Sequence, residues 1–308
     1  MKIVFMGTPE FSVPGLEMLI HSDHRVLAVV TQPDRPKGRG LKLEPSPVKQ
    51  VALEHNLEAL QPEKIVAPEF LARLRGLAPD LIVVIAFGQI LKKDILTLPP
   101  LGCLNVHASL LPRFRGAAPI AWAILNGESE TGITTMQMEE GLDTGPILMQ
   151  KSIAIAPDET GGTLHDRLAK LGAEILNETL SGLEKGSLTP KPQDASNATF
   201  APLLKKEQGR IDWSKSAQEL ERQVRAFDPW PGSFFVWQDQ TIKVWKAKVV
   251  SGTGKPGEVL AADKEGITVA CKAGALRITE LQPPGKRRMS AAEFLRGHRI
   301  LKEFLLSS

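Results

Sequence analysis

Short apolar runs alternate with amphipathic stretches along the first part of the chain. Residues 2–6, 25–30 and 80–86 are nearly continuous apolar runs rich in Val and Ile, a pattern typical of parallel strands that are buried on both faces. The stretches 11–21 and 48–60 between them have the spacing of helices. This alternation predicts an α/β fold with an open, doubly wound sheet.

The same pattern continues into a longer region. A further strand is expected at 101–107 and a helix at 117–126, and apolar alternation returns at 133–138 and 147–155. Over 164–183 the leucines and isoleucines keep helical spacing. We therefore expect a long amphipathic helix to pack against the sheet at the end of this region.

A stretch without periodicity separates this region from the last third of the chain. Residues 186–209 are rich in Pro, Gly, Ser and Asn, which is typical of a linker. We expect a first domain over 1–188, a linker over 189–208 and a smaller second domain over 209–308.

The smaller domain combines two capped helices with short strands. Ser216 with Glu219, and Ser290 with Glu293, form capping-box patterns that each open a helix. Five short segments between these helices are punctuated by Gly and Pro, namely 233–237, 241–250, 257–261, 266–272 and 275–281. Strands at this spacing predict a small, OB-like C-terminal β-barrel, of the type that binds oligonucleotides.

Composition places the chain among globular proteins of about two domains. It has 308 residues, of which 42% are hydrophobic and 24% charged. The apolar run at 3–6 is too short for a signal peptide or a membrane span, so we expect a cytoplasmic protein. Cys103 and Cys271 have no metal-ligand spacing, which argues against a disulfide scaffold or a zinc site.

The charge is distributed unevenly. Residues 1–204 carry 19 Lys and Arg against 23 Asp and Glu, whereas residues 205–308 carry 19 against 12, so the net charges are −4 and +7. A basic module of this kind can bind a polyanion. A solvated surface without a partner can carry the same charge, and the charge alone leaves both interpretations open.

The turn after the first strand argues against a nucleotide cofactor. Residues 7–12 read GTPEFS, which lacks the second and third glycines of the dinucleotide fingerprint. Pro9 also removes an N–H donor where a pyrophosphate would need one. A nicotinamide or flavin oxidoreductase is therefore disfavoured.

Polar side chains gather where the strand at 101–107 ends. Asn105 and His107 lie on one side of this strand, at the carboxyl edge where open α/β sheets bind their ligands. Asp143, in a loop flanked by glycines, can return to the histidine. An amide, an imidazole and a carboxylate together suit acyl transfer. A structural role for each residue is the alternative.

Longer stretches around these residues are similar to a known family. NVHASLLPRFRGAAPI (105–120) and ETGITTMQMEEGLDTGPIL (130–148) resemble the core signature of the formyltransferases that use 10-formyltetrahydrofolate. Further matching segments cover both domains in the expected order: FMGTPEFSVP, TQPDRPKGRGLKLEPSPVK, NATFAPLLKKEQGRIDW, DPWPG and LRITELQPPGKRRMSAAEFLRG. The similarity is greatest to the members that act on methionyl initiator tRNA.

The resemblance implies a reaction and roles for the three polar residues. A formyl group passes from 10-formyltetrahydrofolate, a co-substrate, to the free α-amine of methionine esterified to initiator tRNA, without a metal, nicotinamide or flavin. Asn105 donates to the formyl oxygen as it becomes negative. His107 takes the proton of the amine, and Asp143 orients the imidazole and stabilises its cationic form.

The resemblance also implies binding sites for both substrates. The folate contacts two stretches mainly through backbone and apolar groups: Phe87, Gly88, Gln89, Ile90 and Leu91, and Ser109, Leu110, Leu111 and Pro112. The acceptor arm of the tRNA contacts a basic segment at 33–43 and the basic second domain, through Lys37, Arg39, Lys42, Lys286, Arg287 and Arg288. We expect a monomer, because no apolar stretch is obviously self-complementary.

Two alternatives remain at this point. The same chemistry can serve another amine, such as an amino-sugar nucleotide or glycinamide ribonucleotide. A non-catalytic RNA-binding protein is the second alternative, although it leaves the three polar residues unexplained. The chain also departs from many relatives, since it has no tyrosine, and Phe87 and Phe200 stand where a Tyr is expected. Phe87 and Phe200 cannot make the hydrogen bonds that a tyrosine hydroxyl would make at these positions.

Overall fold

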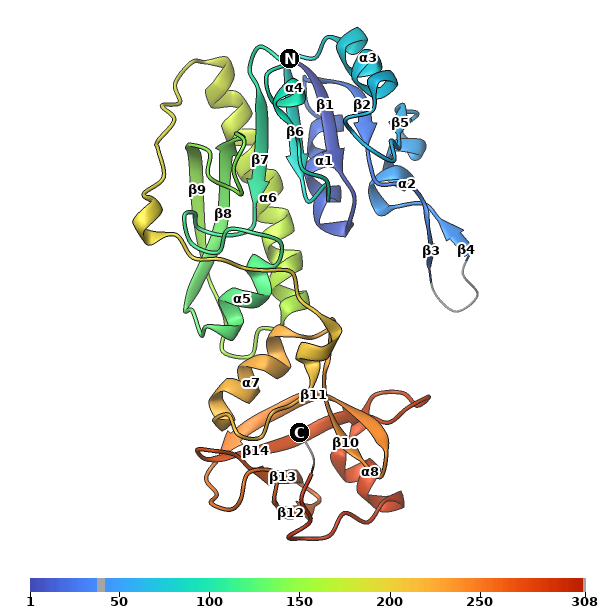
Figure 1. Cartoon of the computed structure of the whole chain (residues 1–308), viewed down its shortest axis with the longest axis vertical. Coiled ribbons are helices and arrows are strands. Elements are labelled where there is room, and N and C mark those ends of the chain that lie inside the picture. The colour runs from blue at the N-terminus through green and yellow to red at the C-terminus, as the bar shows by residue number, and fades with distance from the viewer. Residues whose placement is uncertain (38–41, 307–308) are drawn as a thin grey trace. The chain divides into compact units, whose positions relative to one another are not determined.

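The structure is a computed structural model that describes residues 1–37 and 42–306 (Figure 1). Contacts group the chain into two compact units, each formed from several segments. The first unit comprises Met1–Pro119, Glu130–Ile153 and His165–Ala201, and the second comprises Ile120–Ser129, Ala154–Leu164 and the chain from Pro202 onward. Residues 189–201 of the predicted linker therefore pack within the first unit.

A seven-stranded sheet forms the centre of the first unit, with the order β5-β2-β1-β6-β7-β8-β9. The pairs from β5 to β7 are parallel, whereas β8 runs antiparallel to β7. The strands are β1 (Lys2–Gly7), β2 (Arg25–Val30), β5 (Ala59–Leu60), β6 (Leu81–Ile85), β7 (Cys103–His107), β8 (Glu130–Gln137) and β9 (Ile147–Ala154). The predicted α/β fold is confirmed.

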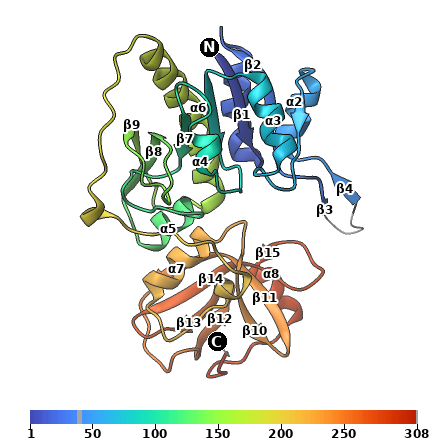
Figure 2. The same ribbon diagram turned by 45° about the horizontal axis from the view of Figure 1, so that its top comes forward.

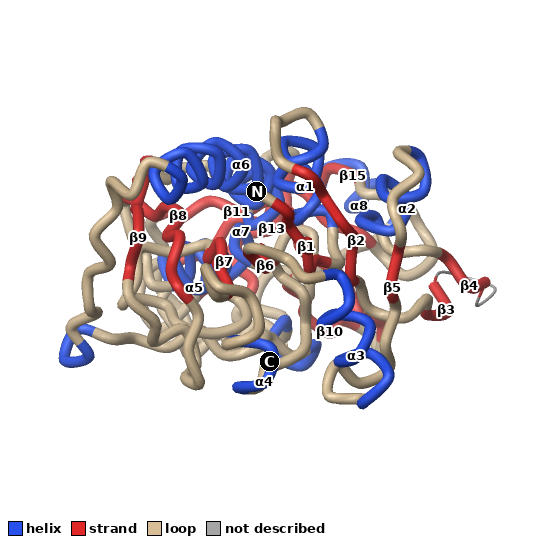
Figure 3. The backbone as a smooth tube through the Cα atoms, turned by 90° about the horizontal axis from the view of Figure 1, so that it is seen from above, coloured by secondary structure: helices blue, strands red, loops and turns tan. Residues whose placement is uncertain are grey.

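Helices cover both faces of this sheet. In Figure 3, α1 (Val13–Ile20) and α6 (Gly161–Glu184) lie on one face, and α3 (Pro68–Leu77) and α4 (Lys93–Leu96) lie on the other. The strands are continuous apolar runs because both faces are covered, and residues such as Val4, Ile82 and Val84 are buried. Strands β2 and β5 lie on one side of β1, and the next strands of this sheet along the chain, β6 and β7, lie on the other side. The switch point, where such sheets bind ligands, therefore lies between β1 and β6.

Two local expectations are corrected by the structure. The helix expected over 48–60 ends early, since α2 spans Pro47–Glu54 and is followed by the edge strand β5. Asn56 takes a left-handed conformation with φ of 54°, which stops the helix. The basic segment at 33–43, for which the family resemblance implies a loop, contains the antiparallel hairpin strands β3 (Arg35–Lys37) and β4 (Lys42–Glu44), which project from the sheet (Figure 2).

The second unit contains an antiparallel sheet with the order β10-β11-β14-β13-β12, to which β15 adds beside β14. Its strands are β10 (Ser233–Trp237), β11 (Gln240–Val250), β12 (Val259–Asp263), β13 (Gly266–Ala270), β14 (Ala275–Gln282) and β15 (Met289–Ser290). The core includes Trp213, Phe235 and Phe294. The predicted smaller β domain is confirmed.

Three helices complete this unit. α5 spans Pro119–Leu125, α7 spans Ala217–Ala226 and α8 spans Ala291–Gly297. Ser216 and Glu219 form the full capping box expected for α7, and Ser290 caps α8 by accepting from the Glu293 N–H. Among the described residues of the whole chain, none of the helices is both long and apolar enough to cross a membrane.

Candidate active site

Two of the expected catalytic residues lie in strand β7, and one of them, His107, is its last residue. Asn105 is half-buried and pairs in register with Val84 of β6, while His107 is 6% exposed and pairs with Thr134 of β8. Because β6 and β7 are parallel neighbours, their carboxyl ends open at the same edge of the sheet. The structure thus places Asn105 and His107 beside the switch point.

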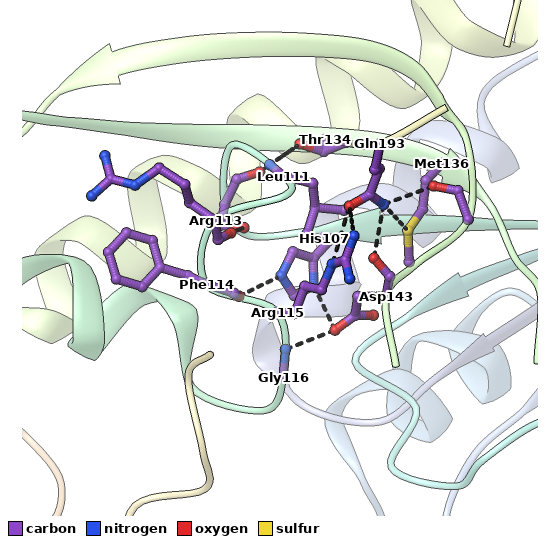
Figure 4. Close-up of polar contacts among 12 residues, drawn as sticks. His107, Leu111, Arg113, Phe114, Arg115, Gly116, Thr134, Met136, Asp143 and Gln193 are labelled. Atoms are coloured by element: carbon purple, nitrogen blue, oxygen red, sulfur yellow. Dashed lines mark hydrogen bonds and ion pairs between the residues drawn. The ribbon is translucent and has the colours of Figure 1, made fainter. Parts of the chain in front are cut away.

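The imidazole of His107 faces two groups with different chemistry. Its Nε2 lies 3.0 Å from the backbone oxygen of Phe114, and its Nδ1 lies 3.7 Å from Oδ2 of Asp143 (Figure 4). A carbonyl can only accept a hydrogen bond, so Nε2 carries a hydrogen in this arrangement. Nδ1 is then the ring atom that can take up a further proton, and the carboxylate stabilises that proton electrostatically.

Asp143 reaches this position from the loop between β8 and β9. Its Oδ2 accepts a 2.8 Å hydrogen bond from the Gly116 N–H, and its backbone is left-handed with φ of 53°. Gly116 has φ of 122°, and a Cβ there would lie 2.7 Å from the Ala201 oxygen. Only glycine fits at this position without strain. The backbone N–H that donates to the Asp143 carboxylate therefore depends on a glycine at position 116.

Two residues that sequence reasoning missed support the Asp143 loop. The Gln193 amide donates to the backbone oxygens of Asp143 at 2.8 Å and of Gly145 at 2.7 Å. Arg115 donates to Gln193 Oε1 through Nε at 3.1 Å and Nη2 at 2.7 Å (Figure 4). Arg115 stands within the matching stretch RFRGAAPI, whereas Gln193 lies in the segment without periodicity, where no local signal marks it.

The stretch expected to bind folate after β7 is a tightly hydrogen-bonded turn. Ser109 Oγ donates to the Arg113 oxygen at 2.6 Å, and the Leu111 N–H donates to Thr134 Oγ1 at 3.1 Å. Gln150 donates to the Leu111 oxygen at 2.9 Å. The Ser109 and Leu111 side chains are buried, whereas the neighbouring pair is half-buried: Leu110 and Pro112. The groups of this turn that a ligand can contact are therefore its backbone and the side chains of Leu110 and Pro112.

The second expected folate stretch follows β6 at the switch point. The Phe87 oxygen accepts from Thr8 Oγ1 at 2.9 Å and from Gln32 Nε2 at 3.3 Å. Gln89 binds the neighbouring backbone instead of pointing free, since its Oε1 accepts from the Ile65 N–H at 3.1 Å. Within this stretch Gly88 and Ile90 are exposed, with Ile90 at 79%, while Phe87 and Leu91 are buried.

Two of the expected tRNA contacts of the first unit lie in the β3–β4 hairpin. Lys37 and Lys42 are opposite each other in its ladder. Arg39 lies outside the described residues. At the base of the hairpin the Asp34 carboxylate accepts from Lys49 Nζ and, at 2.7 Å, from Gln61 Nε2. These bonds tie the residue before β3 to α2 and to the segment that follows β5.

The expected cations of the second unit are exposed side chains between β14 and β15: Lys286, Arg287 and Arg288. Arg288 donates to Asp228 Oδ1 at 2.8 Å, and its guanidinium lies 3.6 Å from the centre of the Trp245 ring. Arg287 donates to Glu293 at 2.7 Å. Arg288 therefore has a packing role in its own unit, whatever else it contacts.

The cysteines are buried thiols away from this chemistry. Burial raises the pKa of Cys103 to about 12 and that of Cys271 to about 11, so both stay protonated and unreactive at neutral pH. Within residues 1–37 and 42–306 there is no cluster of three His, Cys, Asp or Glu side chains that could hold a metal ion.

Two models of one protein family match the chain. The chain matches the formyl transferase family model over residues 1–180 and the model of the formyl transferase C-terminal domain over residues 203–299. The chain belongs to the formyl transferase family, and the resemblance noted in the sequence is confirmed.

Close relatives are methionyl-tRNA formyltransferases. One from Geobacter metallireducens is 55% identical over 97% of this chain and 96% of its own length. Another, from Citrifermentans bemidjiense, is 54% identical over 97% of this chain and 94% of its own length. A solved sugar 3N-formyl transferase, WlaRD, shares the fold at 19% identity, with a TM-score of 0.68 over 93% of this chain and 99% of that one.

Proposed function

We propose that this protein transfers the formyl group of 10-formyltetrahydrofolate to the α-amine of methionyl initiator tRNA, and that it does so in the cytoplasm as a monomer. The relatives named methionyl-tRNA formyltransferase support this substrate. The observation that carries the chemistry is His107, whose Nε2 is held by a carbonyl while Nδ1 faces the Asp143 carboxylate. That arrangement leaves one ring nitrogen able to accept a proton.

The three polar residues divide the work of the reaction. The amine nitrogen forms a bond to the formyl carbon, and the formyl oxygen becomes negative. Asn105 donates its amide N–H to that oxygen. His107 takes the proton that the amine loses, and Asp143 stabilises the imidazolium. The bond from the formyl carbon to the folate nitrogen then breaks, and the proton passes to that nitrogen.

The folate binds in this proposal at the edge formed by the ends of β1, β6 and β7. The contacts come from the backbone of Phe87, Gly88, Gln89, Ile90 and Leu91 and from the turn of Ser109, Leu110, Leu111 and Pro112. WlaRD, which shares the fold, was crystallised with 5-N-formyl-tetrahydrofolate. Gln89 contributes backbone only, because its side chain is engaged with the Ile65 N–H.

The tRNA is held by two basic regions. One is the basic segment at 33–43, with Lys37, Arg39 and Lys42, and the other is the second domain, with Lys286, Arg287 and Arg288. In domain terms, we propose a catalytic, folate-binding domain over 1–188, a linker over 189–208 and a tRNA-binding domain over 209–308. Phosphate contacts of this kind fix the orientation of the substrate without reading its sequence.

The experiment is a formyl-transfer assay with several acceptors. The protein is given 10-formyltetrahydrofolate with methionyl initiator tRNA, uncharged tRNA or a dTDP-linked amino sugar, and His107→Ala serves as the control. Formylmethionyl-tRNA made by the intact protein alone supports the proposal. Formylation of the amino sugar instead would keep the chemistry and refute the tRNA acceptor.

A further inference from the structure

We propose that Arg115 and Gln193 are positioning residues that hold the catalytic loop of Asp143 in its working conformation. The inference rests on the proposed function, because it concerns the carboxylate that acts on His107. Gln193 lies at residues matched by neither family model, in the gap between 180 and 203. In the structure it nevertheless packs within the first unit.

Gln193 uses both amide hydrogens on the catalytic loop. They reach the backbone oxygens of Asp143 at 2.8 Å and of Gly145 at 2.7 Å, on either side of Thr144. Asp143 has φ of 53°, a left-handed conformation that is strained for a residue other than glycine and persists where its surroundings hold it. The two hydrogen bonds supply that support.

Arg115 sets which end of the Gln193 amide faces the loop. Arg115 is 6% exposed, and its guanidinium donates twice to Oε1 of Gln193. An amide turned by 180° would place its NH2 against the cation and its oxygen against two carbonyl oxygens, so only one orientation is compatible. A hydrogen bond from a cation also polarises the amide, which strengthens its own donors.

This clamp, formed by Arg115 and Gln193, closes a ring around the reacting histidine. Phe114 holds Nε2 of His107 through its carbonyl, and Gly116 holds the Asp143 carboxylate through its N–H. Arg115 stands between these two residues and reaches the Asp143 backbone through Gln193. The segment that fixes the imidazole therefore also fixes the carboxylate, and their 3.7 Å separation is defined from both sides.

The test compares two variants of Gln193 with a matched control. Gln193→Met keeps the side-chain length but removes both donors, and Gln193→Glu keeps a partner for Arg115 but turns a carboxylate toward two carbonyl oxygens. A misplacement of about 1 Å costs up to about 100-fold in rate. We expect kcat to fall about 10- to 100-fold in both variants, with the KM for 10-formyltetrahydrofolate changed less than about twofold.

The control is Gln223→Met in the second unit. Gln223 is 4% exposed, and its amide also faces backbone oxygens, those of Gln208, Gly209 and Arg210, at 3.3–3.4 Å. Loss of a buried amide lowers the free energy of unfolding in either unit. Only the loss at Gln193 should lower kcat.

Hydrogen exchange gives a readout that does not depend on turnover. The Gly116 amide is protected by the Asp143 carboxylate, so its exchange should accelerate in Gln193→Met while the amides of β1 and β6 stay protected. Arg115→Lys, which keeps the charge but loses the planar fork, should give a smaller effect of the same kind.

Specific results would overturn the inference. Gln193→Met with the kcat of the wild type, or with a loss no larger than that of Gln223→Met, excludes a positioning role. A raised folate KM with unchanged kcat excludes it as well. Should Gln193→Met fail to fold, Gln193→Glu and Arg115→Lys decide by the same criteria. If the wild type formylates no methionyl-tRNA, the proposed function fails, while the Gly116 exchange still tests the clamp.

Discussion

At the scale of single residues, the site depends on backbone groups as much as on side chains. The Phe114 oxygen selects the histidine tautomer, and the Gly116 N–H binds the Asp143 carboxylate. Neither group can be changed by replacing a side chain directly. Asn105 is different, because its proposed role belongs entirely to its own amide.

Asn105→Ala tests that role. The oxyanion loses its amide donor, and the loss of one such donor typically costs about 100- to 1,000-fold in kcat. The folate KM should change little, since the donor is needed mainly in the transition state. Steady-state kinetics on a variant with an unaltered circular dichroism spectrum provides the check. Full turnover by such a variant would remove Asn105 from the mechanism.

Gly116→Ala tests the close packing of Gly116, whose N–H donates to Asp143, against the backbone of Ala201. Both the φ of 122° and the 2.7 Å distance from an added Cβ to the Ala201 oxygen oppose the substitution. We expect the free energy of unfolding to fall by about 1–3 kcal/mol, together with a loss of kcat. Gly186→Ala is the matched control, because Gly186 has φ of 61° but nothing within 4 Å of an added Cβ. Equal effects on kcat would contradict the argument.

At the scale of elements, the sequence predicted the strands and helices whose signals lie within a few neighbouring residues. The strand expected at 25–30 is found at Arg25–Val30, and the capping box at Ser216 opens α7 as expected. α3 begins without a capping signal, because its N-cap residue Ala67 makes no side-chain hydrogen bond to the first turn. The contact of Gln193 with the Asp143 loop joins residues 50 positions apart, so no local pattern could reveal it.

The base of the β3–β4 hairpin should show a defined pH dependence. Hydrogen bonds from Lys49 and then Gln61 lower the pKa of Asp34 below its ordinary value. A carboxyl whose pKa is lower in the folded state stabilises the fold above its unfolded pKa, and that contribution is lost as pH falls through the folded pKa. Asp34→Asn should therefore be less stable than the wild type at pH 7, and the difference should shrink below about pH 4. Urea unfolding at several pH values measures it, and a difference that stays constant would contradict the ion pair.

At the scale of the whole molecule, the uneven charge should govern affinity for tRNA more than any single contact. Residues 205–308 carry a net +7, from 19 Lys and Arg against 12 Asp and Glu. Each phosphate that a cation neutralises releases counterions, so the affinity falls as salt rises. The exposed cations do not contribute equally, because some of them are engaged within their own unit.

Substitutions of Lys286 and Arg288 should affect different properties, namely tRNA binding for Lys286 and stability for Arg288. Arg288 pairs with Asp228 and lies over Trp245, so Arg288→Ala should lower the free energy of unfolding by about 1 kcal/mol. Lys286 is an exposed cation in the turn before β15. Lys286→Ala should leave stability unchanged and reduce the slope of log affinity against log salt by about one contact. Binding titrations between about 50 and 200 mM salt, beside thermal unfolding, distinguish the two roles. If Lys286→Ala leaves the slope intact, the basic turn does not contact phosphate, and the charge of the second domain must act through other residues.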